Sequence, residues 1–302
     1  KLYITSFLLC LTFLVYAQED TTYSTYNWQE NPTSIDTLDF GSQDIIQLKD
    51  KHIVDFRFLD PNTLIEYDIE HYIYWLNSDE EIENFNKIYL PYNSSSSILK
   101  SKARVIKKDG STIELDESKI MSAKNEETGQ EYKYFAFEGI EKGSAIEYFW
   151  IIKTFPRYSG KRVTLQNDIE KRNIEFDLYA PSNLFFKFKS YNGLDSITHD
   201  TLDTEQQHWY LKLNKQVALE DETYSAYHAN KQFLVYKLDY NSTANVSNII
   251  SYVNSTKNIF EYFYSPTKNK VQKSVTKILK NQNIEIDRRA HVWTPVTWPS
   301  RM

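Results

Sequence analysis

Cysteine is nearly absent from this sequence. Its 302 residues include a single cysteine, Cys10, which lies in an apolar run near the start of the chain. One cysteine cannot form a disulfide within the chain, so no disulfide framework supports the fold. If the segment around Cys10 is removed, thiol catalysis and cysteine-ligated metal sites are excluded as well.

Two other features are missing: an excess of basic charge and a long hydrophobic run. The formal net charge is -6, whereas a nucleic-acid-binding surface needs an excess of lysine and arginine. The apolar run at residues 7–15 falls short of the roughly 20 residues that a membrane-spanning helix requires. We therefore expect neither a nucleic-acid partner nor a stable membrane span.

The chain begins in the manner of a secretion signal. Lys1 precedes the run at 7–15, and Val15 and Ala17 fill the small-residue positions of a cleavage site. The alternatives are a membrane anchor, a buried helix, and a lipid anchor at Cys10, which lacks the small residues that such a site needs. We expect residues 1–17 to be a signal peptide, and the mature protein, cleaved near Ala17, to be secreted or periplasmic.

Two further segments differ from the rest. Residues 18–40 are polar without a sustained period, which predicts a flexible N-terminal extension. Residues 287–302 include the sequence RRAHVWTPVTWPSRM, whose composition departs from that of the preceding chain, and we leave this anomalous tail out of the fold. Because the chain begins with Lys rather than Met, we expect the sequence to be a fragment.

Aromatic and β-branched residues are abundant and fall in short segments. The chain has 23 Tyr, 17 Phe and 6 Trp but only 7 Gly, a composition that suits half-buried strands. Asp109-Gly110 predicts a hairpin between 102–106 and 112–115, and Gly143-Ser144 marks the same pattern between 132–137 and 145–153. Further strand patterns occur at 63–76, 87–91, 174–179, 184–191 and 208–213.

This density of strands predicts a mainly β fold class. We expect an antiparallel β-sandwich over residues 41–244, either one large sandwich or two smaller ones. Beyond it, apolar residues recur at helical spacing over 245–263 and 269–279. Two short C-terminal α-helices are therefore expected within 245–286.

Four segments together resemble a known family. They are residues 71–93, 103–115, 135–152 and 214–238, and they carry, in order, Asp109-Gly110 after an A-x-V strand, Gly143-Ser144 before Ile146-Glu147-Tyr148, and Ala218-Leu219 before Glu220 or Glu222. The combination resembles domain of unknown function 3857 (DUF3857), which occurs in secreted bacterial proteins, usually ahead of a transglutaminase-like domain. The resemblance implies that 245–286 is a helical linker toward such a domain, the partner in the parent protein, which this chain lacks.

Catalytic and metal-binding patterns are sparse. His199, Asp200 and His208, with Asp203 and Glu205 between them, offer metal ligands, but residues so closely spaced on strands alternate between faces. The acidic runs at 79–81 and 220–222 lack the alternation around a central glycine that a calcium loop shows, and we expect both to be solvated charges in loops. We predict no metal, no cofactor and, without a mature thiol, no catalytic residues.

Tyrosines give the positive indication of a binding site. Rings of this kind pack against apolar faces while their hydroxyls form hydrogen bonds, so seven of them could form a platform for a cell-envelope peptide or glycan: Tyr132, Tyr134, Tyr148, Tyr158, Tyr191, Tyr224 and Tyr227. We predict a non-catalytic, exported binding or scaffolding domain. The alternative is a carboxylate-dependent hydrolase of an envelope polymer, which two acidic residues about 5 to 10 Å apart on a concave face would favour.

Overall fold

The computed structural model describes residues 22–32, 35, 40–91, 96–127, 129, 131–200, 206–249, 251–264, 273 and 277. The chain divides into two units, residues 1–248 and 249–302. The predicted signal peptide, the tail at 287–302 and nearly all of the second predicted helix, 269–279, lie outside the described residues. Within the described part, no helix is long and apolar enough to cross a membrane.

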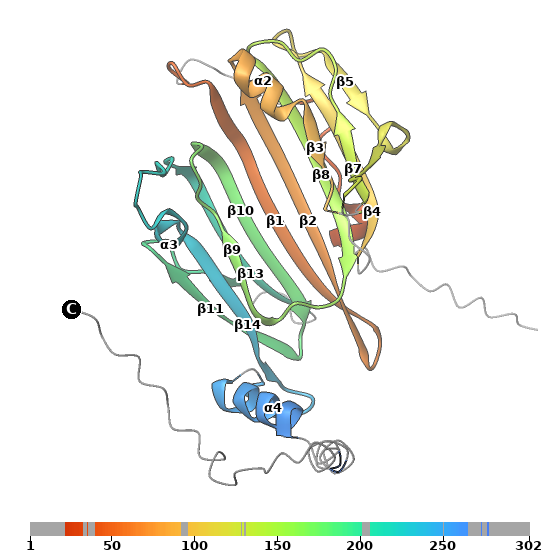
Figure 1. The fold of residues 1–302 in the computed structure, drawn as a ribbon, viewed down its shortest axis with the longest axis vertical. Coiled ribbons are helices and arrows are strands. Elements are labelled where there is room, and N and C mark those ends of the chain that lie inside the picture. The colour runs from red at the N-terminus through yellow and green to blue at the C-terminus, as the bar shows by residue number, and fades with distance from the viewer. Residues whose placement is uncertain are drawn as a thin grey trace, which may run out of the picture. The chain divides into compact units, whose positions relative to one another are not determined.

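An eight-stranded sheet forms the centre of the first unit (Figure 1). Its order is β12 (Thr198–Asp200), β13 (Gln206–Gln216), β10 (Lys171–Pro181), β1 (Ile45–Asp60), β2 (Thr63–Leu76), β8 (Ser144–Thr154), β4 (Ser97–Ile106) and β5 (Thr112–Leu115). Its neighbouring strands pair antiparallel, except that β1 and β10 are parallel. Strand β1 therefore pairs on one side with the strand that follows it and on the other with a strand from far along the chain.

Two small sheets accompany the large one. The first contains β9 (Ser159–Thr164), β11 (Leu184–Tyr191), β14 (Phe233–Asn241) and β15 (Val246–Ser247), and the second contains β3 (Lys87–Tyr89), β7 (Glu131–Ala136) and β6 (Met121–Lys124). The helices of the first unit are short: α1 (Thr22–Thr25), α2 (Asp79–Phe85), α3 (Tyr227–Asn230) and a 3₁₀ turn at Glu117–Lys119. The second unit contains α4 (Tyr252–Tyr264).

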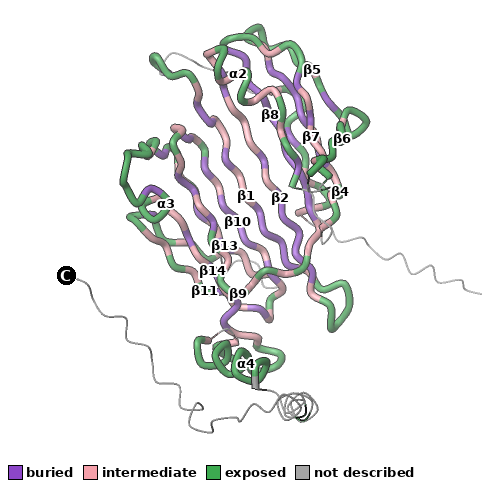
Figure 2. The backbone as a smooth tube through the Cα atoms, in the orientation of Figure 1, coloured by how far each residue is buried: buried purple, intermediate pink, exposed green. Residues whose placement is uncertain are grey.

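Both small sheets pack on the same face of the large sheet, which we call the covered face. Phe176 on β10 and Trp150 on β8 lie in one cross-strand row and so point to the same side. Phe176 packs on Phe188 and Tyr236 of the first small sheet, whereas Trp150 belongs to a core cluster with Phe135 of the second. Figure 2 shows the buried backbone concentrated in the large sheet beneath them.

The opposite face is crossed by the N-terminal residues, so we call it the N-terminal face. Trp28 is 8% exposed and packs with Ile53, Ile69 and Phe149 from three strands of the large sheet. The ring of Tyr26 packs edge-on against Phe149. The prediction of a flexible extension is therefore wrong for the described part of 18–40. Although the segment is mostly polar, its aromatic side chains pack on the sheet.

Strand β2 contributes side chains to both faces of the large sheet. Its residues alternate, so Ile65, Tyr67 and Ile69 point to the N-terminal face while Glu66, Asp68 and Glu70 point to the covered face. Those three carboxylates belong to a charged seam on the covered face, which we define as Asp50, His52, Glu66, Asp68, Glu70, Arg157, Lys161 and Lys171.

Opposite charges are paired along this seam. Lys171 Nζ lies 2.5 Å from Asp50 Oδ2, and His52 Nε2 lies 2.9 Å from Asp50 Oδ1. Arg157 Nη2 lies 2.7 Å from Glu66 Oε1, and Lys161 Nζ lies 3.0 Å from an oxygen of Asp68. Burial of so many charges is tolerated because each has an ionic partner.

The mainly β, antiparallel prediction is confirmed, and so is the first hairpin. Ile106 pairs with Thr112 across the turn, where Gly110 adopts a φ of 82°, a conformation that glycine accommodates without strain. The second hairpin prediction is wrong, because β7 pairs with β3 and β6 while β8 pairs with β2 and β4. The two segments lie in different layers.

Two local expectations also need correction. The acidic run 79–81 forms the first turn of α2 rather than a loop, and the Ser78 side chain accepts a hydrogen bond from Glu81 N. Negative charge there favours the helix N-terminus. The first C-terminal helix begins at Tyr252 instead of residue 245, because Val246–Ser247 forms β15 with β14.

Candidate functional site

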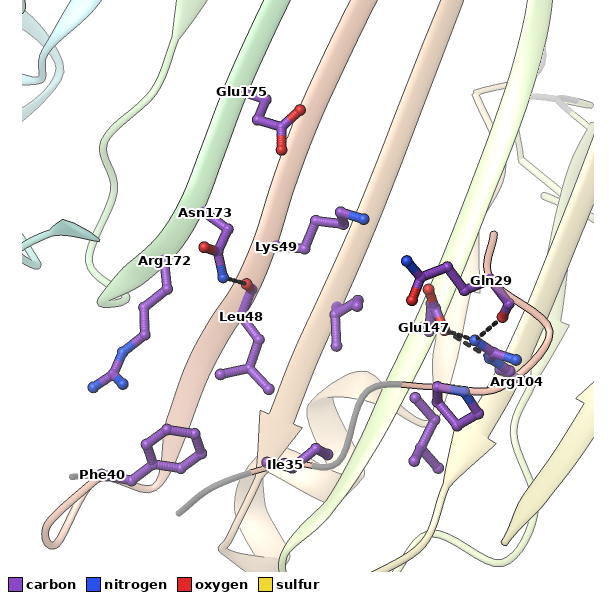
Figure 3. Close-up of a pocket in the computed structure, with 13 residues that line it drawn as sticks. Gln29, Ile35, Phe40, Leu48, Lys49, Arg104, Glu147, Arg172, Asn173 and Glu175 are labelled. Carbon is purple, nitrogen blue, oxygen red and sulfur yellow. Dashed lines mark hydrogen bonds and ion pairs between the residues drawn. The ribbon is translucent and has the colours of Figure 1, made fainter. Parts of the chain in front are cut away.

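A pocket of about 420 Å³ opens on the N-terminal face of the large sheet (Figure 3). Strands β10, β1, β2, β8 and β4 form its floor, and the N-terminal segment forms one wall. Its lining combines apolar and charged side chains: Gln29, Pro32, Ile35, Phe40, Leu48, Lys49, Ile73, Arg104, Ile106, Glu147, Arg172, Asn173 and Glu175. Such a mixture is typical of ligand pockets, in which a few polar groups fix the orientation of the ligand.

Strand register brings the charged residues of the floor together. Lys49 on β1 pairs with Ile73 on β2, Ile73 pairs with Glu147 on β8, and Glu147 pairs with Arg104 on β4. Residues paired in this way point to the same face of a sheet. A register shift between Gln47 and Lys49 lets Lys49 join this row while Gln47 faces the other side.

Beneath the pocket, Arg104 holds the N-terminal segment against the sheet. Its Nε donates to Glu147 Oε2 at 2.6 Å, and its two terminal nitrogens donate to the carbonyl oxygens of Gln29 and Glu30 at 3.0 and 3.1 Å. The Trp28 ring lies 4.4 Å from the guanidinium carbon, close enough for a cation–π contact. The segment is thus fixed by charge as well as by apolar packing.

Glu147 also contacts a buried histidine. His71 Nε2 lies 2.8 Å from Glu147 Oε1, and the Tyr26 hydroxyl lies 2.7 Å from His71 Nδ1. Burial lowers the pKa of His71 despite the hydrogen bond to Glu147, so the ring is neutral, Nε2–H donates to Glu147 and Nδ1 accepts from Tyr26. Burial alone would raise the pKa of Glu147, but His71 and Arg104 outweigh it and lower that pKa.

Lys49 is the charged residue of the pocket without a partner. Its amine is half-buried and makes no ion pair or hydrogen bond with the residues that the structure describes. Burial lowers its pKa, against the opposing effect of Glu147 and Glu175. Glu147 is engaged by Arg104, and Glu175 Oε2 lies 2.7 Å from Lys51 Nζ. Figure 3 shows Lys49 between these two carboxylates, so the pocket contains one uncompensated positive charge.

The opposite wall of the pocket is apolar. Phe40 and Trp75 pack edge to face with ring centres 4.9 Å apart, and Ile35 and Leu48 pack against them. The Arg172 guanidinium lies over the Phe40 ring at 4.8 Å, and its Nη2 lies 2.9 Å from Glu170. A ligand here would meet apolar walls and, at Lys49, a cation.

Nothing in the pocket assembles into a metal site. Among the described residues, no group of three or more His, Cys, Asp or Glu side chains could hold a metal ion. Of the candidates at 199–208, His208 Nε2 lies 2.9 Å from Asp177, His199 Nε2 lies 2.7 Å from Gln207 Oε1 and Asp200 lies 3.8 Å from His208. Asp203 and Glu205 lie outside the described residues.

The predicted tyrosine platform does not form a single surface. Tyr132 and Tyr134 lie together on β7 beside the exposed Tyr89 of β3, with ring centres 6.2 and 5.6 Å from it. Spacing by two residues on a strand explains why these two share a face. They remain candidates for an exposed aromatic contact, apart from the pocket.

The other five tyrosines are dispersed. Tyr148 is 5% exposed within the core and Tyr227 is buried on α3, so their prediction as surface residues is wrong. Tyr191 stacks on Phe233 at 4.6 Å, Tyr158 is partly buried just before β9, and Tyr224 is fully exposed. Tyr148 points to the covered face, because its neighbours Glu147 and Phe149 point to the N-terminal face, and β8 is buried on both faces.

Lys49, Arg104 and Glu147 were not predicted as site residues. Arg104 is the middle residue of the A-x-V strand and Glu147 lies in the Ile146-Glu147-Tyr148 motif, so the segments that carry the family resemblance contain this ion pair. The available signal was a charged residue inside an otherwise apolar strand, since such residues are buried only when paired. The sequence offers no comparable signal for the pairing itself.

Comparisons with known proteins agree with this architecture. A crystal structure of a "putative protease" from Parabacteroides distasonis ATCC 8503 superposes with a TM-score of 0.54 at 14% identity, over 64% of this chain and 40% of that one. At this identity the likeness shows the fold alone, and the chain spans less than half of that protein. 

Two further structures are less similar. A "putative nutrient binding protein" from Legionella pneumophila gives a TM-score of 0.32 at 4% identity over 64% of this chain and 67% of that one. An M1 zinc metallopeptidase from Deinococcus radiodurans gives 0.31 at 6% identity over 65% and 42%. TM-scores this low do not establish a shared fold.

The sequence itself decides the family. No curated protein matches it. The model of the family described as "Domain of Unknown Function with solved-structure structure (DUF3857)" matches residues 67–220, which include most of β2, all of β8 and the Arg104–Glu147 pair. This chain belongs to the DUF3857 family.

Proposed function

We propose that this protein is a non-catalytic binding domain that holds an anionic end of an extended peptide in the pocket on its N-terminal face. The observation that carries the proposal is Lys49, a half-buried ammonium in an apolar-walled pocket without a partner among the described residues. An unpaired buried charge is costly, and a carboxylate bound there would form a charge-assisted hydrogen bond in partly desolvated surroundings. The pocket is therefore suited to an anion.

The alternative, a carboxylate-dependent hydrolase, has less support. Glu147 and Glu175 both line the pocket, but each is already in an ion pair, and the pKa of Glu147 is lowered. A general acid needs a raised pKa. Asp55 and Glu66, whose pKa values burial raises, are fully buried, which keeps them from a polymer substrate.

We further propose that the domain acts outside the cytoplasm as a scaffold beside a second domain. The N-terminal sequence favours export, and the family resemblance favours a transglutaminase-like neighbour in a longer protein. The Parabacteroides protein, of which this chain covers 40%, shows that the fold occurs in a longer chain. Helix α4 exposes Tyr252, Val253, Ile259, Tyr262 and Phe263, and clusters of exposed apolar side chains tend to mark interfaces.

Binding can be tested with a simple peptide. The probe is acetyl-Gln-Ala-Leu-Ala-Leu with a free C-terminal carboxylate, and its C-terminal amide is the matched neutral probe, both measured by isothermal titration calorimetry. We expect the free acid to bind about tenfold more tightly than the amide and Lys49→Gln to remove the difference, since a hydrogen bond to a charged group is worth that much or more. Lys187→Gln, an exposed lysine on β11, is the control.

Two results would contradict this function. Equal affinity for the acid and the amide would show that no anion is recognised at Lys49. Turnover in a peptidase assay with casein, or in a transamidation assay with an amine donor, would show that the chain is an enzyme. Thermal unfolding of each variant, followed by circular dichroism, establishes that a loss of binding is not a loss of the fold.

A further inference from the structure

A second hollow adjoins the pocket on the N-terminal face. Its volume is about 470 Å³, and Pro32, Ile35 and Ile106 line both cavities. Its other lining residues come from the end of β2, from the turn between β4 and β5 and from the residue that precedes β8: Trp75, Asn77, Lys107, Lys108, Asp109, Gly110 and Gly143. Because the two cavities share a wall, we treat them as one groove that crosses the strands from β10 to the β4–β5 turn.

The far end of this groove also carries an uncompensated positive charge. Lys107 and Lys108 make no ion pair with any residue that the structure describes. Asp109 lines the same hollow, but its carboxylate accepts hydrogen bonds from the Ser111 backbone and hydroxyl at 2.9 and 2.6 Å. Two lysines against one aspartate leave one positive charge, which matches the single charge of Lys49 at the other end.

At this end of the groove, one lysine side chain lies against a glycine. Gly143 has a φ of +83°, and a Cβ built on it would lie 2.2 Å from Lys108 Cε. The Lys108 stem therefore lies directly across the Gly143 backbone, in space that any other residue would occupy. The absence of a side chain at Gly143 thus leaves room for the exposed Lys108 side chain at this end of the groove.

Between the two charged ends, the walls of the groove are apolar, and its floor contains the Arg104–Glu147 ion pair, whose charges compensate each other. Ile35, Pro32 and Ile106 are its shared wall. Phe40 and Trp75 are both buried and pack on each other, so neither ring presents a free face on which a sugar could stack. This lining favours a peptide with apolar side chains over a glycan.

The span of the groove sets the length of its ligand. From Lys49 on β1, three interstrand steps through β2 and β8 lead to β4, which ends at Ile106 just before Lys107. At about 4.8 Å per step the lateral distance is about 14 Å. The row of Lys49 meets β4 at Arg104, and Lys107 lies three residues further along the chain, which adds about 10 Å along the strand. The two ends are therefore about 17 Å apart, and because an extended chain covers about 3.3 to 3.6 Å per residue, about five residues bridge them.

We infer that the groove binds an acidic peptide in extended form, with one anionic group at Lys49 and a second, at the other end of a stretch of about five residues, at Lys107 and Lys108. The inference rests on the proposed function and adds the ligand class. Charge complementarity supports it, because the protein as a whole is acidic, with a formal charge of -6, while both ends of the groove are cationic. The first anionic group binds at Lys49, because a half-buried amine without a partner gains the most favourable interaction from an anion.

The test compares two peptides that differ in one group. Acetyl-Glu-Ala-Leu-Ala-Leu carries a side-chain carboxylate four residues before its C-terminal carboxylate, and acetyl-Gln-Ala-Leu-Ala-Leu lacks it. By calorimetry we expect the Glu peptide to bind about tenfold more tightly. The double variant Lys107→Gln, Lys108→Gln should abolish this difference and leave affinity for the Gln peptide unchanged, whereas Lys49→Gln should weaken both. Lys187→Gln with Lys215→Gln, two exposed lysines outside the groove, is the charge-matched control.

The outcomes separate the two proposals. If the Glu peptide has no advantage, or keeps it in the Lys107/Lys108 variant, the second subsite does not exist, although Lys49-dependent binding of the Gln peptide would still support the first. If neither peptide binds, the proposed function is wrong and this inference is wrong with it. Tighter binding of trigalacturonate than of the Glu peptide would overturn the assignment to a peptide and identify an anionic glycan instead.

Discussion

Arg104 on β4 and Glu147 on β8 form a buried ion pair on the N-terminal face, with Arg104 Nη2 2.6 Å from Glu147 Oε2. Both side chains are removed from water, and Arg104 also bonds two backbone carbonyls of the N-terminal segment. The pair therefore joins two central strands to a segment that would otherwise contact the sheet through aromatic rings.

Breaking this pair from one side should be costly. We expect Arg104→Met to lower the free energy of unfolding by about 3 to 5 kcal/mol, because Glu147 is left as a buried charge without its ion-pair partner. The double variant Arg104→Met, Glu147→Leu should lose less than the sum of the two single variants. Urea denaturation followed by tryptophan fluorescence measures all three.

An exposed ion pair provides the matched control. Lys142 Nζ lies 2.7 Å from Asp79 with both side chains largely in water, so Lys142→Met should cost about 0 to 1 kcal/mol. A loss in Arg104→Met no larger than in Lys142→Met would show that the buried pair does not stabilise the fold.

The Trp28 side chain should also contribute strongly to the stability of this region. Its ring is buried on the sheet by Ile53, Ile69 and Phe149, so Trp28→Ala should cost about 3 to 5 kcal/mol, as a large buried aromatic does. The control is Phe155→Ala. Phe155 is 69% exposed, so this substitution should change the free energy of unfolding by no more than about 0.5 kcal/mol. Thermal and urea unfolding of both variants check the difference, and equal effects would mean that residues 22–32 do not pack as described.

Asp55 makes the stability depend on pH. Burial raises its pKa to about 6, although Arg57 Nε donates to it at 2.7 Å and opposes the shift. A carboxyl whose pKa is higher in the folded state contributes stability that is complete below its unfolded pKa, about 3.9, and is lost as the pH rises through about 6. The shift of roughly two pKa units corresponds to about 3 kcal/mol.

Asp55→Asn should remove this dependence. We expect the variant to be more stable than the parent near about pH 8 and close to it near about pH 4, because the amide is neutral at both values. The midpoints of urea unfolding, measured for both proteins across this pH range, give the difference in their stability. The other carboxyl groups contribute equally in both proteins, so their effects cancel. Parallel pH profiles for parent and variant would exclude a raised pKa at Asp55.

The pKa values of two histidines, the partly buried His52 and the buried His71, should shift in opposite directions. Burial disfavours the charged form of His52, but the carboxylate of Asp50 outweighs it and raises the pKa, whereas burial prevails at His71 and lowers the pKa there. Stability from His52 is therefore present below about pH 6.5 and lost as the pH rises above it, whereas stability from neutral His71 is present above about pH 6.5 and lost as the pH falls.

An NMR titration of the ring signals tests both residues in one sample. We expect the His52 pKa above, and the His71 pKa below, the ordinary value of about 6.5. Asp50→Asn should lower the His52 pKa, and Asp79→Asn, an exposed carboxylate on α2, should leave it unchanged. A His71 pKa above that of His52 would contradict the described arrangement of charges.

Strands with local alternation were predictable from sequence, and strand β1 was not. Residues 63–76 alternate apolar and polar side chains and form β2 with the same bounds. In β1, by contrast, Lys49, Asp50, Lys51, His52 and Asp55 interrupt the apolar pattern. Their charges are tolerated because partners such as Lys171 and Glu175 come from β10, and a pairing between such distant segments leaves no local signal.

The site was less predictable than the fold for the same reason. Lys49 is a site residue because Glu147 and Glu175 have other partners, which depends on four strands, β1, β10, β8 and β4, and their register. The tyrosine prediction considered abundance, whereas Tyr148 lies on β8, which is buried on both faces, and Tyr132 and Tyr134 lie on β7 of a small sheet. The order of the strands and the covering of both faces could not be predicted from the sequence.

The place of β1 in the sheet determines how short this protein can be made. The residues that the family model recognises, 67–220, exclude β1 and β14, yet β1 lies between β10 and β2. A protein trimmed to those residues would divide the large sheet into two pieces, each with an unpaired apolar edge of the kind that aggregates. The stretch that defines membership of the family is thus shorter than the stretch that can fold.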